Sequence, residues 1–140
     1  MQHNGEDMMK FIEWDQSLSV DIEEIDNQHK GLIEMVNLLE SSAKATDRHK
    51  ICFEIVMKLK NYFNEHFMTE ERYMIEYDYP ELVAHKKEHN EFIKNVLDFE
   101  IACVEFYSPY TPMLDFLKEW FAKHIKNTDM KMGIFLKEKR

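Results

Sequence analysis

Residues 66–89, HFMTEERYMIEYDYPELVAHKKEH, decide the fold, because they predict two helices joined by a short turn. The second helix is expected to start at Pro80, since proline suits the first turn of a helix. Each half carries two potential metal ligands four residues apart, and residues at this spacing share one face of a helix. The pairs are His66 with Glu70 and His85 with His89.

The two pairs also lie at the same height along the predicted hairpin. Glu70 is eight residues before Asp78, whereas His85 and His89 are five and nine residues after Pro80. At about 1.5 Å per residue, Glu70 and the two histidines of the second helix are all roughly 7–14 Å from the turn. The ligands of the two helices should therefore lie side by side.

Apolar residues recur at helical spacing four times along the chain, which predicts four helices. The helices are separated by breaks at Ser41–Asp47, Asp78–Pro80 and Ser108–Pro112, with Asp47 as an N-cap and the last helix starting after Pro112. Short links join antiparallel neighbours, so we expect an all-α, up-down-up-down antiparallel four-helix bundle. The single domain would comprise an irregular N-terminal arm (1–20), the bundle (about 21–129) and a short C-terminal tail (130–140).

Composition excludes several classes of function. The net charge of −9 argues against nucleic acid and against anionic membranes as partners. The chain has no apolar run long enough for a membrane span and no signal-peptide pattern at its start, so a cytoplasmic location is expected. The net charge favours a soluble monomer. The two cysteines, Cys52 and Cys103, form no CxxC pair and are expected to be core thiols toward the same end of the bundle, with a redox pair as the less favoured alternative.

Potential ligands interrupt the apolar stripes of all four predicted helices. His29 falls between Ile25 and Leu32, and His124 follows Phe121. Taken singly, an inward histidine is more often an ordinary hydrogen-bonded core residue than a ligand. Five imidazoles and a carboxylate at one level of a core would be costly unless something bound them, and a metal is the natural partner.

The stretch HIKNTDMK (124–131) adds a seventh candidate ligand. His124 and Asp129 are five residues apart, so on a regular helix they would diverge by about 140°. Both can face inward only if the helix takes a wide turn around Lys126–Thr128. The two remaining histidines, His3 and His49, are expected at the surface.

With these residues in place, the chain resembles the hemerythrin family, in particular its single-domain bacterial members. The family pattern of H, HxxxE, HxxxH and HxxxxD is present in order, and the resemblance covers nearly everything after residue 10. It runs through WDQSLSV (14–20), IDNQH (25–29), HFMTEERYM (66–74), YPELVAHKKEH (79–89) and WFAKHIKNTD (120–129).

The resemblance implies a di-iron centre that binds O2 reversibly, as a hydroperoxide, at one open iron position. One iron would have three histidine ligands (His85, His89, His124) and the other two (His29, His66), with Glu70, Asp129 and a solvent-derived oxygen as bridges. The role would be oxygen storage, delivery or sensing rather than catalysis, with an oxygen-consuming enzyme as a possible recipient. The apolar lining of the O2 pocket would be Leu32, Phe67, Trp120, Phe121 and Ile125.

Two departures from the family pattern bear on this expectation. Phe121 stands where bacterial relatives commonly have leucine, which predicts a narrower pocket and altered oxygen affinity or autoxidation. Met130 and Met132 stand where relatives often have lysine and tyrosine.

Two alternatives to oxygen binding remain open. One is a di-iron enzyme acting on peroxide or nitric oxide, for which the apolar lining offers no obvious proton donor. The other is iron buffering, for which the bundle lacks extra carboxylates.

Overall fold

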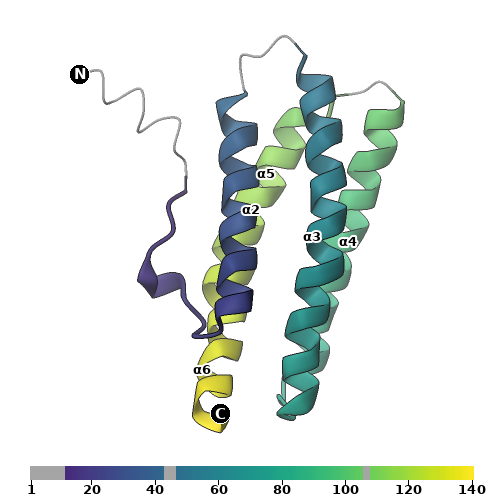
Figure 1. Cartoon of the computed structure of the whole chain (residues 1–140). Helices are drawn as coiled ribbons and strands as arrows, with labels where there is room; N and C mark the ends of the chain where they lie inside the picture. The colour runs from purple at the N-terminus through teal and green to yellow at the C-terminus, as the bar shows by residue number, and fades with distance from the viewer. Residues whose placement is uncertain (1–11, 43–46, 106–107) are drawn as a thin grey trace, which may run out of the picture.

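The computed structural model describes residues 12–42, 47–105 and 108–140, and it confirms the antiparallel four-helix bundle (Figure 1). The described residues form helices and connecting segments, with no strand among them. None of these helices is both long enough and apolar enough to cross a membrane. The first three helices of the bundle are α2 (Glu23–Ser41), α3 (Arg48–Glu76) and α4 (Leu82–Val104).

The fourth helix of the bundle consists of three consecutive parts. They are α5 (Tyr110–Trp120), the π-helix η2 (Phe121–Asp129) and α6 (Met130–Lys139). The residues from 130 onward, expected as a short tail, are therefore a helix that continues the bundle. Met132 and Leu136 of α6 are fully buried, which makes α6 part of the core.

The predicted helix starts differ from the structure at both prolines. Pro80 lies in the turn before α4, whose N-cap is Glu81. Helix α5 starts two residues before Pro112 and has Pro109 as its N-cap. Proline is tolerated at Pro112 because the first backbone N–H groups of a helix have no partner inside the helix. Asp47 does take the N-cap position of α3, but its side chain makes no capping hydrogen bond.

A compact turn at the end of α3 fixes the hairpin that carries four of the candidate ligands. Asp78 adopts a left-handed conformation with φ of 55°. The N–H of Asp78 donates to the carbonyl of Ile75 (3.3 Å), and the N–H of Tyr79 donates to the carbonyl of Met74 (2.9 Å). This is the Schellman pattern, which ends a helix abruptly and sets the direction of the next segment. The turn thereby brings α4 back alongside α3.

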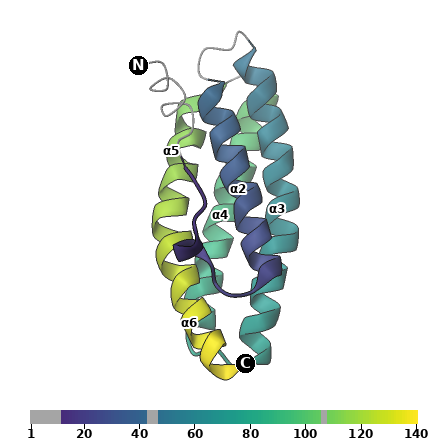
Figure 2. The same cartoon turned by 60° about the vertical axis from the view of Figure 1, so that its left-hand side comes forward.

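The N-terminal arm packs along the fourth helix of the bundle (Figure 2). Its described part contains one short 3₁₀ helix, η1 (Gln16–Leu18). Asn37 of α2 holds the start of this part, because its side chain exchanges two hydrogen bonds (3.0 and 2.8 Å) with the backbone of Ile12. Further along, Val20 lies so close to Gly133 of α6 that a β-carbon at Gly133 would be 2.9 Å from Val20 Cβ. The arm and α6 therefore stabilise each other.

Candidate metal centre

All seven candidate ligands converge in the interior, and none is more than 2% exposed. Each of the four helices of the bundle contributes at least one of them. They are His29 from α2, His66 and Glu70 from α3, His85 and His89 from α4, and His124 and Asp129 from η2. His49 is half-buried in the first turn of α3, away from these residues, and His3 lies outside the described residues.

The ligand atoms form two groups that share both carboxylates. Within each group, the candidate ligand atoms lie within 4.8 Å of one another. The first group is His85, His89, His124, Glu70 and Asp129; the second is His29, His66, Glu70 and Asp129. Two adjacent positions for a positive ion result, one with three imidazoles and the other with two.

Glu70 divides its two oxygens between the two groups. Oε2 faces His66 Nε2 at 2.9 Å and His29 Nε2 at 3.3 Å. Oε1 faces His85 Nε2 at 3.1 Å and His89 Nε2 at 3.0 Å. Each oxygen of the carboxylate therefore serves one position, as a bridging ligand requires.

Asp129 divides its oxygens in the same way. Oδ2 faces His29 Nε2 at 2.9 Å. Oδ1 faces His85 Nε2 at 3.0 Å and His124 Nε2 at 3.1 Å. The two carboxylates thus span the same pair of positions, although Glu70 comes from the middle of the sequence and Asp129 from near its end.

The π-helix explains how His124 and Asp129 both face inward, and it confirms the predicted wide turn. The widened region extends from Phe121 to Asp129, which is longer than expected. Asn127 Nδ2 donates to the carbonyl of Ala122, five residues earlier, at 3.1 Å. Because hydrogen bonds in a π-helix join residues five apart, residues at this spacing come onto one face. Such widened turns are frequent at functional sites.

Three polar residues that sequence analysis missed hold the outer nitrogens of histidines on the neighbouring helix. His66 Nδ1 donates to Gln28 Oε1 (2.6 Å). His89 Nδ1 donates to Glu71 Oε2 (3.0 Å), and His124 Nδ1 donates to Glu88 Oε1 (2.6 Å). A proton on Nδ1 leaves the Nε2 lone pair pointing into the cluster, which is how proteins orient metal-binding histidines.

The pairing of these supporting residues follows the order of the helices. Gln28 of α2 supports α3, Glu71 of α3 supports α4, and Glu88 of α4 supports η2. Each of the three is adjacent in sequence to a candidate ligand, yet each supports a histidine on a different helix. Adjacency could have drawn attention to these residues, but the partner of each depends on how the helices pack.

The histidines and carboxylates inside the cluster shift each other's pKa values. Burial alone would lower the pKa of His29 and His85, but the adjacent carboxylates of Asp129 and Glu70 raise these pKa values to about 9 and about 10. Burial outweighs the carboxylates at His66 and lowers its pKa. Although burial opposes ionisation of Glu70 and Asp129, the surrounding histidines hold the pKa of both carboxyls well below the usual range. A compact group of positive and negative charges is the result.

The donor set fits metal ions better than it fits a self-contained hydrogen-bond network. Among the described residues, Glu70 Oε2, both oxygens of Asp129 and His124 Nε2 have no partner in hydrogen-bond geometry, despite histidine nitrogens and carboxylate oxygens about 3 Å apart. Buried polar atoms without a partner need a physical reason, and an ion bound between them would supply one. Imidazole with carboxylate suits iron and other first-row transition metals.

Aromatic rings cover part of the cluster. Phe67 stacks on His89 with ring centroids 3.8 Å apart, and Trp120 stacks on His124 at 3.9 Å. Leu32 and Ile125 are buried in the same apolar core. Phe121 belongs to this core too, but it also lines a hollow of about 390 Å³ between the fourth helix of the bundle and the N-terminal arm. Of the five predicted pocket residues, Phe67 and Trp120 thus contact the histidines directly.

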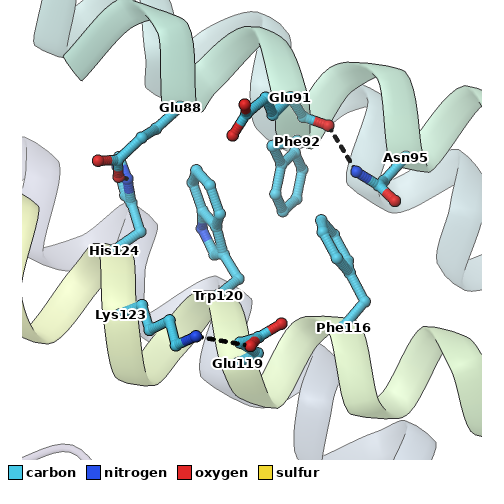
Figure 3. A pocket seen from close by; sticks show the side chains of 9 residues that line it. All are labelled: Glu88, Glu91, Phe92, Asn95, Phe116, Glu119, Trp120, Lys123 and His124. Carbon is cyan, nitrogen blue, oxygen red and sulfur yellow. Dashed lines mark hydrogen bonds and ion pairs between the residues drawn. The ribbon is translucent and has the colours of Figure 1, made fainter. Parts of the chain in front are cut away.

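A surface groove of about 360 Å³ between α4 and the fourth helix approaches the cluster from outside (Figure 3). Trp120 and His124 lie on its inner side, and Phe92 and Phe116 point into it from opposite helices. Glu88, which holds His124, lies at one end of the groove. The groove therefore approaches the site at His124, which is itself buried.

Tyr62 is a further residue near the cluster, and sequence analysis did not single it out. Its ring stacks on His66 with centroids 4.8 Å apart. Burial raises the pKa of Tyr62 well above its usual value, and the charges of Glu70 and Asp129 raise it further. Tyr62 therefore keeps its phenolic proton beside the candidate ligands.

Cys52 and Cys103 are both buried as free thiols, as expected. Burial, with a contribution from the neighbouring Cys52, raises the pKa of Cys103 to about 11. The two thiols are therefore close enough to interact. Because the thiolate is the reactive form, the raised pKa argues against a redox role.

Comparison with known proteins gives a consistent result. Residues 20–133 match the family model described as "Hemerythrin HHE cation binding domain". The bacteriohemerythrin of Clostridium acetobutylicum is 33% identical over 121 residues, covering 83% of this chain and 94% of the relative. That of Pseudomonas paraeruginosa is 32% identical over 121 residues, covering 86% and 78%. The myohemerythrin of Theromyzon tessulatum is 31% identical over 119 residues, covering 85% and 88%.

Proposed function

The chain belongs to the hemerythrin family, and we propose that it is a non-heme di-iron protein that binds dioxygen reversibly, for storage, delivery or sensing. His85, His89 and His124 would hold one iron, and His29 and His66 the other. Glu70 and Asp129 would bridge the two. The observation that carries this assignment is the division of each carboxylate between the two groups of histidines.

The unequal number of histidines supports a site for one small ligand. With both carboxylates shared, the position of His29 and His66 has one protein ligand fewer than the other position. An open coordination position is what a metal site needs to take up an external ligand. When bound, the iron pair would supply the electrons that reversible binding of dioxygen requires.

The residues around the site would favour reversible binding of dioxygen over its use to oxidise a substrate. Five neutral imidazoles add no negative charge, whereas related di-iron enzymes rely mostly on carboxylates. The rings of Phe67 and Trp120 exclude water from the faces of His89 and His124. We therefore propose that the protein is a carrier or sensor and not an enzyme.

The alternative is an enzyme that acts on peroxide or nitric oxide at the same centre. One observation favours it, namely the protonated phenol of Tyr62 next to His66, since such an enzyme needs a proton donor. Iron buffering is a weaker alternative.

Metal analysis and optical titration test the proposal together. Purified protein should contain two iron ions per chain, and the reduced protein should gain visible charge-transfer bands in air and lose them under argon over repeated cycles. Bands that disappear irreversibly while peroxide is consumed would favour the enzyme. Protein that takes up iron at no fixed ratio and binds no dioxygen would overturn the proposal.

Other features of the function follow as proposals. Dioxygen is the proposed ligand, and an oxygen-consuming enzyme a proposed recipient. The net charge of −9 supports neither nucleic acid nor an anionic membrane as a partner. We also propose that residues 1–140 form a single hemerythrin-like domain, monomeric and located in the cytoplasm.

A further inference from the structure

Tyr62 places a hydroxyl group among the aromatic side chains next to the cluster. It lies one turn before His66 on the inner face of α3, and its side chain is 8% exposed. Its ring is 5.9 Å from that of Phe67 and 6.0 Å from that of Phe92 (centroid to centroid). These rings lie on the side of the cluster that faces the main apolar core.

The hydroxyl group of Tyr62 is buried and has no hydrogen-bond acceptor among the described residues. The indole Nε1 of Trp120 lies beside this hydroxyl, but an indole N–H can only donate, so it offers the phenolic proton no acceptor. Buried polar groups are nearly always paired, and an exception needs a physical reason. The Tyr62 hydroxyl is therefore a donor without an acceptor in the part of the chain that the structure describes.

Packing does not explain the hydroxyl, because phenylalanine would fill the same space without it. The neighbouring aromatic positions are indeed occupied by phenylalanine, at Phe63, Phe67 and Phe92. Leaving a buried hydroxyl unpaired costs free energy, whereas replacing it with an apolar group of the same shape is nearly neutral. An acceptor from outside the protein would compensate this cost.

The position of Tyr62 identifies the kind of acceptor. Tyr62 stacks on His66, which belongs to the group with two histidines, the one with an open position. We propose that Tyr62 donates a hydrogen bond to the small ligand bound beside His29 and His66, and so favours ligands whose outer atom is negatively charged. This inference rests on the proposed function, because it requires a ligand at that position.

Tyr62→Phe is the variant that tests the inference, with Tyr110→Phe as a matched control. Tyr110 is also buried, but its hydroxyl donates to the carbonyl of Leu39 at 2.6 Å, at the other end of the bundle. The two variants remove the same atom from a buried tyrosine. Among the described residues, Tyr110 donates its hydroxyl proton to an acceptor and Tyr62 does not.

The first measurement is the affinity of the oxidised, iron-containing protein for azide. A hydrogen bond to a charged acceptor corresponds to roughly a tenfold or larger change in affinity. We expect Tyr62→Phe to weaken azide binding by about tenfold and Tyr110→Phe to leave it unchanged. The infrared band of bound azide should also shift in D2O in the wild-type protein and in Tyr110→Phe, but not in Tyr62→Phe.

The second measurement is unfolding of the iron-free protein by urea, which does not depend on a bound ligand. Tyr62→Phe should unfold at the same urea concentration as the wild type or at a higher one, whereas Tyr110→Phe should unfold at a lower one. If Tyr62→Phe were destabilised as much as Tyr110→Phe, the hydroxyl would have a structural partner and the inference would be wrong.

The outcomes separate the inference from the proposed function. If the wild type binds azide and dioxygen and Tyr62→Phe binds azide equally well, with the same D2O shift, the inference alone fails. If the wild type contains iron but binds neither ligand, the proposed function fails and the inference with it. The hydrogen bond from Tyr62 to the bound ligand would be established if Tyr62→Phe binds azide more weakly, loses the D2O shift and remains as stable as the wild type.

Discussion

Glu88 of α4 accepts a hydrogen bond from Nδ1 of His124 on η2, over 2.6 Å. The same carboxylate oxygen also accepts a hydrogen bond from Thr128 Oγ1 at 2.9 Å. Glu88 therefore fixes the orientation of the π-helix as well as the tautomer of His124. Its pKa is lowered, mainly by the hydrogen bond from His124, so it remains a carboxylate.

Replacing Glu88 should weaken metal binding without unfolding the protein. Loss of a residue that supports a metal-binding histidine typically lowers metal affinity by about 10–100-fold, and we expect Glu88→Ala to fall in this range. Competition for iron with a chelator measures the effect. Glu91→Ala, in the same groove, is the control and should behave as the wild type. Equal iron retention in both variants would show that Glu88 does not support the site.

Phe121→Leu should accelerate both the release of oxygen and autoxidation. Phe121 is part of the apolar core around the cluster, and the smaller side chain would open space between η2 and the arm. Stopped-flow release of oxygen and the loss of visible bands over time measure the two rates. Phe116→Leu is the control, because Phe116 is half-buried in the groove on α5. Unchanged rates in Phe121→Leu would mean that the ring does not narrow the ligand's path.

The metal-free protein should lose stability as the pH rises. The folded-state pKa values of His29 and His85, about 9 and about 10, are above the usual 6.5. Their contribution to stability is therefore complete below about pH 6.5 and is lost as the pH rises through 9 to 10. We expect a decrease on the order of a few kcal/mol in the free energy of unfolding.

Iron should remove this pH dependence, because histidines that bind metal must be deprotonated. Urea unfolding at several pH values, with and without iron, measures both effects. A metal-free protein as stable at pH 10 as at pH 6.5 would contradict the charge balance between these histidines and the carboxylates.

Gly133→Ala should destabilise the protein by separating α6 from the arm. The new β-carbon would lie 2.9 Å from Val20 Cβ and 3.1 Å from its Cα, so the backbone of the arm has to move. Overpacking of this kind typically costs about 1–3 kcal/mol. Gly31→Ala is the control, because nothing lies within 4 Å of its added β-carbon, and in a helix the change should stabilise by about 0.5–1 kcal/mol. Thermal unfolding of both variants measures the difference.

The sequence was sufficient to predict the bundle and the convergence of the seven side chains, because both follow from helical periodicity. His66 with Glu70, and His85 with His89, share a face whenever their segments are helical. The spacing of His124 and Asp129 even required a widened turn, and the π-helix η2 provides it. Helix ends were less predictable, since Pro80 and Pro112 fit more than one position near the start of a helix.

Only the tertiary structure decided how neighbouring helices complete the site. The pairing of Gln28, Glu71 and Glu88 with histidines on other helices depends on the rotation and stagger of those helices, which periodicity within one helix does not determine. The same holds for Tyr62. Its position on the inner face of a helix follows from periodicity, but only the packing of the surrounding rings shows that its hydroxyl has no acceptor among the described residues. Sequence periodicity sets which face of a helix turns inward, and the packing of side chains between helices sets what each inward group meets.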